Sequence, residues 1–239
     1  MPELRRPYIL SGYRGNTFCG CWKTAGCSVF HLNNETGNIA VNAPWIAIFA
    51  ALAVSHSSLP HPHGALAATC GASASLLAAS SVAYHGIGWF SREVMDRALC
   101  VYASGIVLTV AAFVNWGVFV LFSEACAATY VFLSMSVAVY TLTRRKEDLP
   151  RAVGHYFAAL AVPAGHAVLL YPPTHPAMEG AYFGALLVLT AAVFRLAHFP
   201  ENRCPGRFDF VLQSHQLWHF LSLLGTYLVF RGFARAVAP

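Results

Sequence analysis

The sequence has little charge. Only 10% of its 239 residues are Asp, Glu, Lys or Arg, whereas 57% are hydrophobic, and an ordinary soluble domain carries roughly 25% charged residues. This shortage excludes a typical soluble domain and predicts an integral membrane protein. The 15 basic and 10 acidic residues give a formal net charge of +5, and the basic residues do not form the clustered patch that a nucleic-acid interface needs. Nucleic acid is therefore not an expected partner.

Two further features are missing. The first 38 residues are polar and contain no apolar run that ends in a small-residue cleavage site, so we expect no signal peptide. The seven cysteines are an odd number, and three of them lie in or beside apolar stretches, which disfavours a secreted disulfide framework. Cys19, Cys21 and Cys27 match no zinc-binding spacing, and free thiols on a reducing side are the favoured interpretation.

Long apolar stretches fill most of the chain between residues 39 and 233. A transmembrane helix needs about 20 apolar residues, and seven stretches approach that length: 39–59, 64–87, 98–122, 125–143, 154–171, 178–199 and 212–233. The short alternating segments of a membrane β-barrel are missing. We therefore expect an all-α integral membrane protein, with a seven-helix transmembrane domain at 39–233, an N-terminal segment at 1–38 and a short tail at 234–239.

The basic residues predict the orientation, because cytoplasmic loops are enriched in Lys and Arg. Thirteen of the fifteen lie in the N-terminal segment or in the loops after the second, fourth and sixth stretches. They are Arg5, Arg6, Arg14, Lys23, Arg92, Arg97, Arg144, Arg145, Lys146, Arg151, Arg195, Arg203 and Arg207. The N-terminus is expected in the cytosol and the C-terminus outside or in a lumen, in the plasma membrane or in an endoplasmic reticulum or Golgi membrane.

The expected orientation excludes one other seven-helix class, and the positions of the lysines exclude a second. G-protein-coupled receptors place the N-terminus outside, and rhodopsins need a Lys in the last span for a retinal Schiff base. The two lysines, Lys23 and Lys146, both lie in polar segments.

Three histidines lie where a membrane span makes them costly, so they are candidate functional residues. His85 ends the second stretch, and His215 and His219 begin the last one. An i, i+4 pair projects from one helix face and can bind one metal ion, and the expected topology places all three imidazoles on the cytosolic side. Three nitrogen ligands leave a fourth position for water, as in a catalytic zinc site. The alternative is that each histidine is hydrogen-bonded to a neighbouring helix near the membrane surface.

Six short segments occur in an order that resembles one known family. They are YILSGYR at 8–14, NETGNI at 34–39, SVAYH at 81–85, SGI at 104–106, PGRFD at 205–209 and SHQLWH at 214–219. Together they resemble the progestin and adipoQ receptor (PAQR) family, which includes the haemolysin III type proteins and belongs to a superfamily with alkaline ceramidases.

The resemblance implies a seven-helix bundle with an intramembrane zinc ion (Zn2+) held by His85, His215 and His219, and a supporting role for Ser81. Members of the family are described as receptors for adiponectin or progestins, and several are thought to hydrolyse ceramide-like amides. The expected partners are therefore the lipid bilayer, a lipid amide or sterol-like ligand, or a protein ligand.

The sequence departs from the family pattern at two positions. Asn42 stands where the first motif usually has a His, and Tyr102 stands where the receptors carry the Asp of the site. Asp96 follows His85 by eleven residues, a spacing similar to that of the Asp in alkaline ceramidases, and is the candidate carboxylate for catalysis. Its alternative role is a solvated charge beside Arg92 and Arg97, because an ungapped receptor-type alignment places it in a loop.

Two polar residues begin the first span, Glu35 and Asn38. The family resemblance suggests scaffold residues near the site, and helix capping is the alternative.

Two functions follow from these observations. The first is a zinc-dependent membrane amidase that acts on ceramide or a related lipid amide, with Asp96 and Ser81 as candidate catalytic residues. The second is a non-catalytic receptor or lipid sensor in which zinc is structural. A transporter is disfavoured because the chain has no internal repeat and no buried carboxylate chain. The basic run at 144–146 suits either an anionic lipid or a simple topogenic signal.

Overall fold

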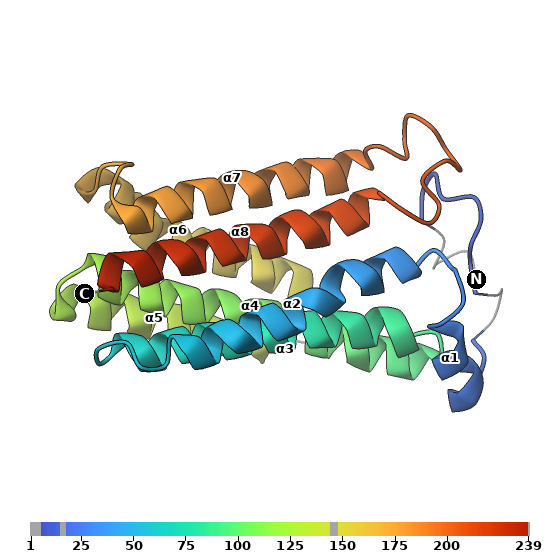
Figure 1. Ribbon diagram of the computed structural model, residues 1–239, viewed down its shortest axis with the longest axis horizontal. Helices are drawn as coiled ribbons and strands as arrows, with labels where there is room; N and C mark the ends of the chain where they lie inside the picture. Colours follow the sequence, from blue (N-terminus) through green and yellow to red (C-terminus); the bar gives the residue numbers. More distant parts are fainter. Residues whose placement is uncertain (1–5, 15–17, 144–147, 239) are drawn as a thin grey trace. The chain divides into compact units, whose positions relative to one another are not determined.

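The computed structural model of the protein describes residues 6–14, 18–143 and 148–238 (Figure 1). Arg5 and the basic run at 144–146 lie outside these residues. The described part of the chain is helical and has no strand. Its helices are α1 (Trp22–Ser28), α2 (Thr36–Ser55), α3 (His63–Ile87), α4 (Arg92–Leu121), α5 (Glu124–Leu142), α6 (Leu149–Leu170), α7 (Pro176–Ala197) and α8 (Ser214–Val237).

Six of the helices found among the described residues, α2, α3, α4, α5, α7 and α8, are long and apolar enough to cross a membrane. In α6 the apolar run Gly154–Leu170 is shorter. The all-α prediction is confirmed, and the structure gives six helices that meet the criteria of a span where the sequence predicted seven. Large apolar side chains on these helices are exposed, among them Leu76 at 70%, Phe132 at 75% and Leu196 at 82%. Surfaces of this kind suit contact with lipid tails.

The start of α4 differs from the sequence prediction. The helix begins at Arg92, six residues before the expected apolar stretch, and therefore includes Asp96. Ser91 Oγ accepts a hydrogen bond from the backbone N–H of Val94 at 3.1 Å, which satisfies one of the free donors at a helix N-terminus. The ion pair between Arg97 and Glu93, one turn apart, supports the same turn of helix. The polar residues before the span thus form helix and not loop.

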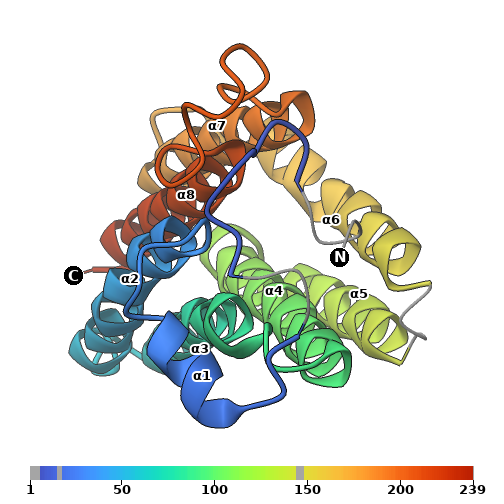
Figure 2. The same ribbon diagram turned by 90° about the vertical axis from the view of Figure 1, so that its right-hand side faces the viewer.

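The chain divides into two compact units. One unit contains Ile48–Leu77, Ala103–Gly184 and Thr226–Pro239. Its aromatic core is centred on Phe230, which is fully buried and packs edge-on against Trp116 at 5.0 Å between ring centroids. A second apolar cluster joins α4, α5 and α6 through Val107, Ala138 and Tyr156. Figure 2 shows α4 and α5 side by side.

Within this unit α7 and α8 cross at two glycines. A Cβ atom on Gly232 would lie 2.9 Å from Gly180 Cα, and one on Gly180 would lie 2.7 Å from the carbonyl oxygen of Leu228. Small residues allow helix backbones to approach this closely, which is a common basis for helix association in membranes. A side chain at either position would push the two helices apart.

The other unit contains Met1–Ala47, Ala78–Tyr102 and Ala185–Gly225. It combines the N-terminal segment, the start of α2, the end of α3, the start of α4, the end of α7 and the start of α8. The connection between α7 and α8 carries three buried polar residues, Glu201, Asp209 and Gln213. Buried polar groups require hydrogen-bond partners, and those of this unit surround the candidate site.

Candidate metal centre

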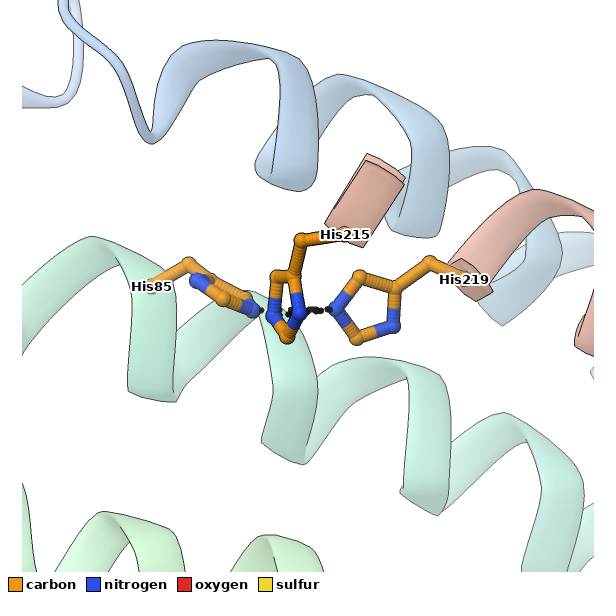
Figure 3. Close-up of side chains that lie close together, drawn as sticks. All are labelled: His85, His215 and His219. Atoms are coloured by element: carbon orange, nitrogen blue, oxygen red, sulfur yellow. Dashed lines mark hydrogen bonds between the residues drawn. The ribbon is translucent and has the colours of Figure 1, made fainter. Parts of the chain in front are cut away.

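The three candidate histidines converge in one place (Figure 3). His85 comes from the last turns of α3, whereas His215 and His219 lie one turn apart at the start of α8. The Nε2 atom of His219 lies 3.1 Å from Nε2 of His85 and 3.2 Å from Nε2 of His215. The ligand nitrogens of the three residues all lie within 4.8 Å of one another, so the cluster can hold a metal ion.

A carboxylate holds the outer nitrogen of one of these ligands. Glu35 Oε2 lies 2.7 Å from Nδ1 of His85, while Nε2 of the same ring points into the cluster. A carboxylate that is hydrogen-bonded to Nδ1 places the proton on that nitrogen, so that Nε2 keeps its lone pair free. Metal-binding histidines almost always have such a partner, which fixes the ring and raises its basicity. Glu35 thus holds the ring of His85 in the orientation that directs Nε2 into the cluster.

Glu35 is itself held by two other side chains. Arg6 Nη2 donates to both of its carboxylate oxygens, at 2.7 and 2.9 Å, and Asn38 Nδ2 donates to Oε2 at 2.6 Å. Burial by itself would raise the pKa of Glu35, but the charge of Arg6 and the hydrogen bond with His85 hold that pKa well below its usual range. Glu35 is therefore charged at neutral pH and supplies a negative charge behind the ligand.

The start of α8 is fixed from the connection that precedes it. Glu201 is only 3% exposed, and its carboxylate accepts hydrogen bonds from the backbone N–H of Ser214, at 2.8 Å, and from the Ser214 hydroxyl. A carboxylate at a helix N-terminus satisfies a free N–H and interacts favourably with the helix dipole. This contact holds the helix end from which His215 and His219 project.

Tyr102 lies beside the cluster, at the position where the family resemblance predicted an Asp. Its ring centroid is 6.0 Å from that of His219, and its ring stacks on Tyr84 at 6.2 Å with an interplanar angle of 9°. Tyr84 in turn packs edge-on against His85 at 5.0 Å. The two tyrosines therefore form an aromatic wall next to two of the histidines.

The two candidate catalytic residues lie on different helices. Ser81 is one turn before His85, is 1% exposed, and its hydroxyl oxygen has no hydrogen-bond partner among the described residues. Asp96 is on α4 and forms an ion pair with Arg92, at 3.6 Å between Oδ2 and Nε. The ion pair is the contact that the alternative role of Asp96 predicted.

Asn42, the other departure from the family pattern, is buried and donates a hydrogen bond to the carbonyl oxygen of Asn38 at 2.8 Å.

Several residues that build this site were not predicted from the sequence. Arg6 entered only as a basic residue in the prediction of orientation, and Glu201 was not considered, although they contact Glu35 and Ser214, respectively. Gln213 was not considered, yet it accepts a hydrogen bond from Arg6 Nη1 at 2.9 Å. A charged residue within or next to a recognised motif was the signal that could have indicated Arg6, which is two residues before the first motif.

Comparison with known proteins gives both a full-length and several local matches. A family model described as Haemolysin-III related matches residues 30–230. The ADIPOR-like receptor IZH2 of Saccharomyces cerevisiae is 26% identical, over 97% of this chain and 80% of the relative. Membrane progestin receptor gamma of Mus musculus is 48% identical over 42 residues, which cover 18% of this chain and 13% of that receptor. Human membrane progestin receptor delta is 48% identical over 40 residues, 17% of this chain and 11% of the receptor.

The family match covers most of the chain and contains the three histidines and Glu35. It also contains the start of each helix that is long and apolar enough to cross a membrane. The resemblance seen in the sequence motifs is thus confirmed. The chain belongs to the Haemolysin-III related family and is an integral, multi-pass membrane protein.

Proposed function

We propose that His85, His215 and His219 hold a zinc ion. The observation that carries this proposal is the convergence of three Nε2 atoms, with Glu35 on the outer nitrogen of His85. Nitrogen ligands about 2.0–2.1 Å from zinc at tetrahedral angles are about 3.3–3.4 Å apart. The two nitrogen–nitrogen distances of 3.1 and 3.2 Å are close to that value.

The reaction that best suits this centre is hydrolysis of a lipid amide, such as a ceramide. Held by these three nitrogen ligands, a zinc ion would lower the pKa of a bound water molecule to about 7 and so would supply a nucleophile at neutral pH. In the reaction the amide C–N bond and one O–H bond of water break, a C–O bond to the acyl carbon forms, and the amine leaves with the proton from that water molecule. The products are a fatty acid and an amine.

The side chains around the centre have distinct roles in this proposal. Ser81 presents a buried hydroxyl without a hydrogen-bond partner among the described residues, on the same helix face as His85. It is the group that would donate a hydrogen bond to the substrate carbonyl. Asp96 is the carboxylate that would accept and return the proton, which requires it to exchange its partner Arg92 for the substrate or a water molecule.

The first test is the metal content of the purified full-length protein. About one zinc per chain is expected, and His219→Ala should lose it. His166→Ala is a matched control, because His166 belongs to the other unit and bonds the hydroxyl of Tyr130. Equal zinc content in the parent and His219→Ala would contradict the proposed centre.

The second test is release of fatty acid from a panel of ceramides. The zinc-loaded parent should release fatty acid, and Ser81→Ala and Asp96→Asn should lower the rate while zinc content stays unchanged. Loss of general acid–base catalysis commonly costs 10²- to 10⁴-fold in rate. A parent that binds zinc but hydrolyses no ceramide would contradict the enzymatic proposal and leave the metal centre standing.

The second candidate is a receptor or lipid sensor in which zinc is structural. It is favoured by Tyr102, because a tyrosine with a reference pKa near 10 is a poor general base and its aromatic wall suits a flat apolar ligand. Relatives of this chain are named membrane progestin receptors, so progesterone is the appropriate probe. Binding of progesterone that is weakened by His85→Ala, without any hydrolysis, would support this candidate. Binding that is unaffected by removal of zinc would contradict it.

We also propose that α6 is a seventh span and that the N-terminal segment lies in the cytosol. Support comes from the apolar run Gly154–Leu170 and from the unequal distribution of basic residues between alternate loops. In this topology residues 1–38 and the α7–α8 connection lie on the same side as the three histidines.

A further inference from the structure

The N-terminal segment ahead of α1 makes specific contacts with the metal centre. We call residues 6–14 the strap. The strap is closed on itself by the hydroxyl of Tyr13, which accepts a hydrogen bond from the backbone N–H of Arg6 at 2.9 Å and donates to the carbonyl oxygen of Ile9 at 3.2 Å. The side chain of Ile9 is 4% exposed. The strap therefore has a defined conformation.

One end of the strap reaches the side chain of His85 through Glu35. Arg6 binds both oxygens of the Glu35 carboxylate, and Glu35 Oε2 lies on Nδ1 of His85. The second arm of the same guanidinium donates to Gln213 Oε1, two residues before His215. Arg6 thus connects the segment before α2 with the residues that lead into α8.

The other end of the strap reaches the backbone of the same ligand. Arg14 Nη2 donates to the carbonyl oxygen of His85, and Nη1 donates to that of Gly86, both at 2.6 Å. The last carbonyl oxygens of a helix have no partner within the helix, and a cation there also interacts favourably with the helix dipole. Arg14 therefore holds the end of α3 from which the His85 side chain projects.

Between these two ends, the strap is anchored to the connection between α7 and α8. Asp209 is 2% exposed and accepts hydrogen bonds from the backbone N–H groups of Leu10 and Ser11, at 3.0 and 2.7 Å, and from the Ser11 hydroxyl at 2.6 Å. The backbone of Gly206 donates to the carbonyl oxygen of Tyr8 at 3.1 Å. Both contacts bring the strap to the segment that precedes His215 and His219.

We propose that the strap is part of the metal centre, with Arg6 and Arg14 as positioning residues that fix His85 by its side chain and by its backbone. This inference rests on the proposed metal centre and deepens it. Arg6 acts through Glu35, because it binds both carboxylate oxygens and so directs Oε2 at Nδ1 of His85. Arg14 acts on the helix end itself. Together they hold the ligand from α3 in register with the two ligands from α8.

The strap makes a quantitative prediction about metal affinity. Removing a partner that orients a metal-binding histidine typically costs 10- to 100-fold in affinity. Arg6→Gln should therefore weaken zinc binding by about that factor, as should Glu35→Gln. Arg6→Lys should recover only part of the loss, because an ammonium group cannot bind both the carboxylate and Gln213 in the planar geometry of a guanidinium.

The experiment measures zinc affinity by competition with a chelator, using the detergent-solubilised full chain. The variants are Arg6→Gln, Arg14→Gln, Glu35→Gln and the double variant Arg6→Gln/Glu35→Gln. Arg97→Gln is the matched control, because Arg97 pairs with exposed Glu93 and is itself exposed. A second readout is the visible spectrum of the cobalt-substituted protein, which a general loss of stability would not shift.

The expected result is a 10- to 100-fold loss for Arg6→Gln, a loss for Arg14→Gln, a shifted cobalt spectrum for both, and parent-like affinity for Arg97→Gln. The double variant should lose less than the sum of the two single losses, because two residues that share a contact are not additive. Unchanged affinity in Arg6→Gln and Arg14→Gln, or fully additive losses in the double variant, would overturn the strap while the metal centre stands. A parent protein that binds no metal would overturn both.

Discussion

The crossing of α7 and α8 at two glycines predicts a specific loss of stability. In Gly232→Ala the new methyl group would lie 2.9 Å from both Gly180 Cα and the carbonyl oxygen of Pro176. Both neighbours are backbone atoms, so no side-chain rotation can relieve the overlap, and the helices must separate. Forcing an extra methyl group into a packed interior costs about 1–3 kcal/mol, and rigid neighbours place this case near the upper end.

The gain in helix propensity offsets part of that cost. Alanine is about 1 kcal/mol more favourable than glycine inside a helix, so the net destabilisation of Gly232→Ala should be about 2 kcal/mol. Gly165→Ala in α6 is the matched control, because a Cβ atom there meets no described residue within 4 Å. That variant should be more stable than the parent, by up to about 1 kcal/mol.

The assay is reversible unfolding in mixed micelles, followed by circular dichroism as the denaturing detergent is increased. The two alanine variants should shift the midpoint in opposite directions. A Gly232→Ala protein that is as stable as the parent, or more stable, would refute the idea that direct backbone contact holds α7 and α8 together in this unit.

Three further predictions concern topology, the capped start of α8 and the aromatic wall. Hydrogen bonds from Thr24 lower the pKa of the exposed Cys21 thiol, so the rate of its alkylation should reach half of its maximum at a lower pH than for a simple thiol. A membrane-impermeant maleimide should label Cys21 only from the cytosolic side and Cys126 only from the opposite side. Labelling of both cysteines from one side would contradict the proposed topology. Glu201→Gln should destabilise the protein by about 1–2 kcal/mol, because a buried carboxylate that caps a helix is lost, and chemical unfolding that matches the parent would contradict this. Tyr102→Asp should raise ceramide hydrolysis at least tenfold if general base catalysis limits the rate, whereas an unchanged rate would show that the missing carboxylate is not limiting.

Much of the fold and the core of the site were predictable from local patterns. The apolar stretches have the length that the bilayer demands, so the helices could be located from composition, with errors of a few residues at their ends. The i, i+4 spacing of His215 and His219 fixes their common face by helix geometry. His85 could be added because the expected topology places it on the same side.

The remaining parts of the site depend on contacts that a sequence pattern does not encode. Arg6 and Asp209 are ordinary charges in the sequence, and their importance arises from partners that lie far away along the chain. The start of α4 was placed too late because apolarity marks the membrane and not the helix, which continues into polar residues. The contact of Asp96 with Arg92 likewise depends on that extra helical turn.

The separation of these contacts along the chain has a consequence for biosynthesis. Arg6 and Gln213 are 207 residues apart, and His85 and His219 are 134 residues apart. At a synthesis rate of about 5–20 residues per second, the strap is synthesised roughly 10–40 s before Gln213, its partner in the α7–α8 connection. The nascent protein must therefore insert most of its helices before a metal ion can find three ligands. At the proposed metal centre, metal capture would accordingly be a late event in assembly, after the helices from α2 to α7 have been synthesised.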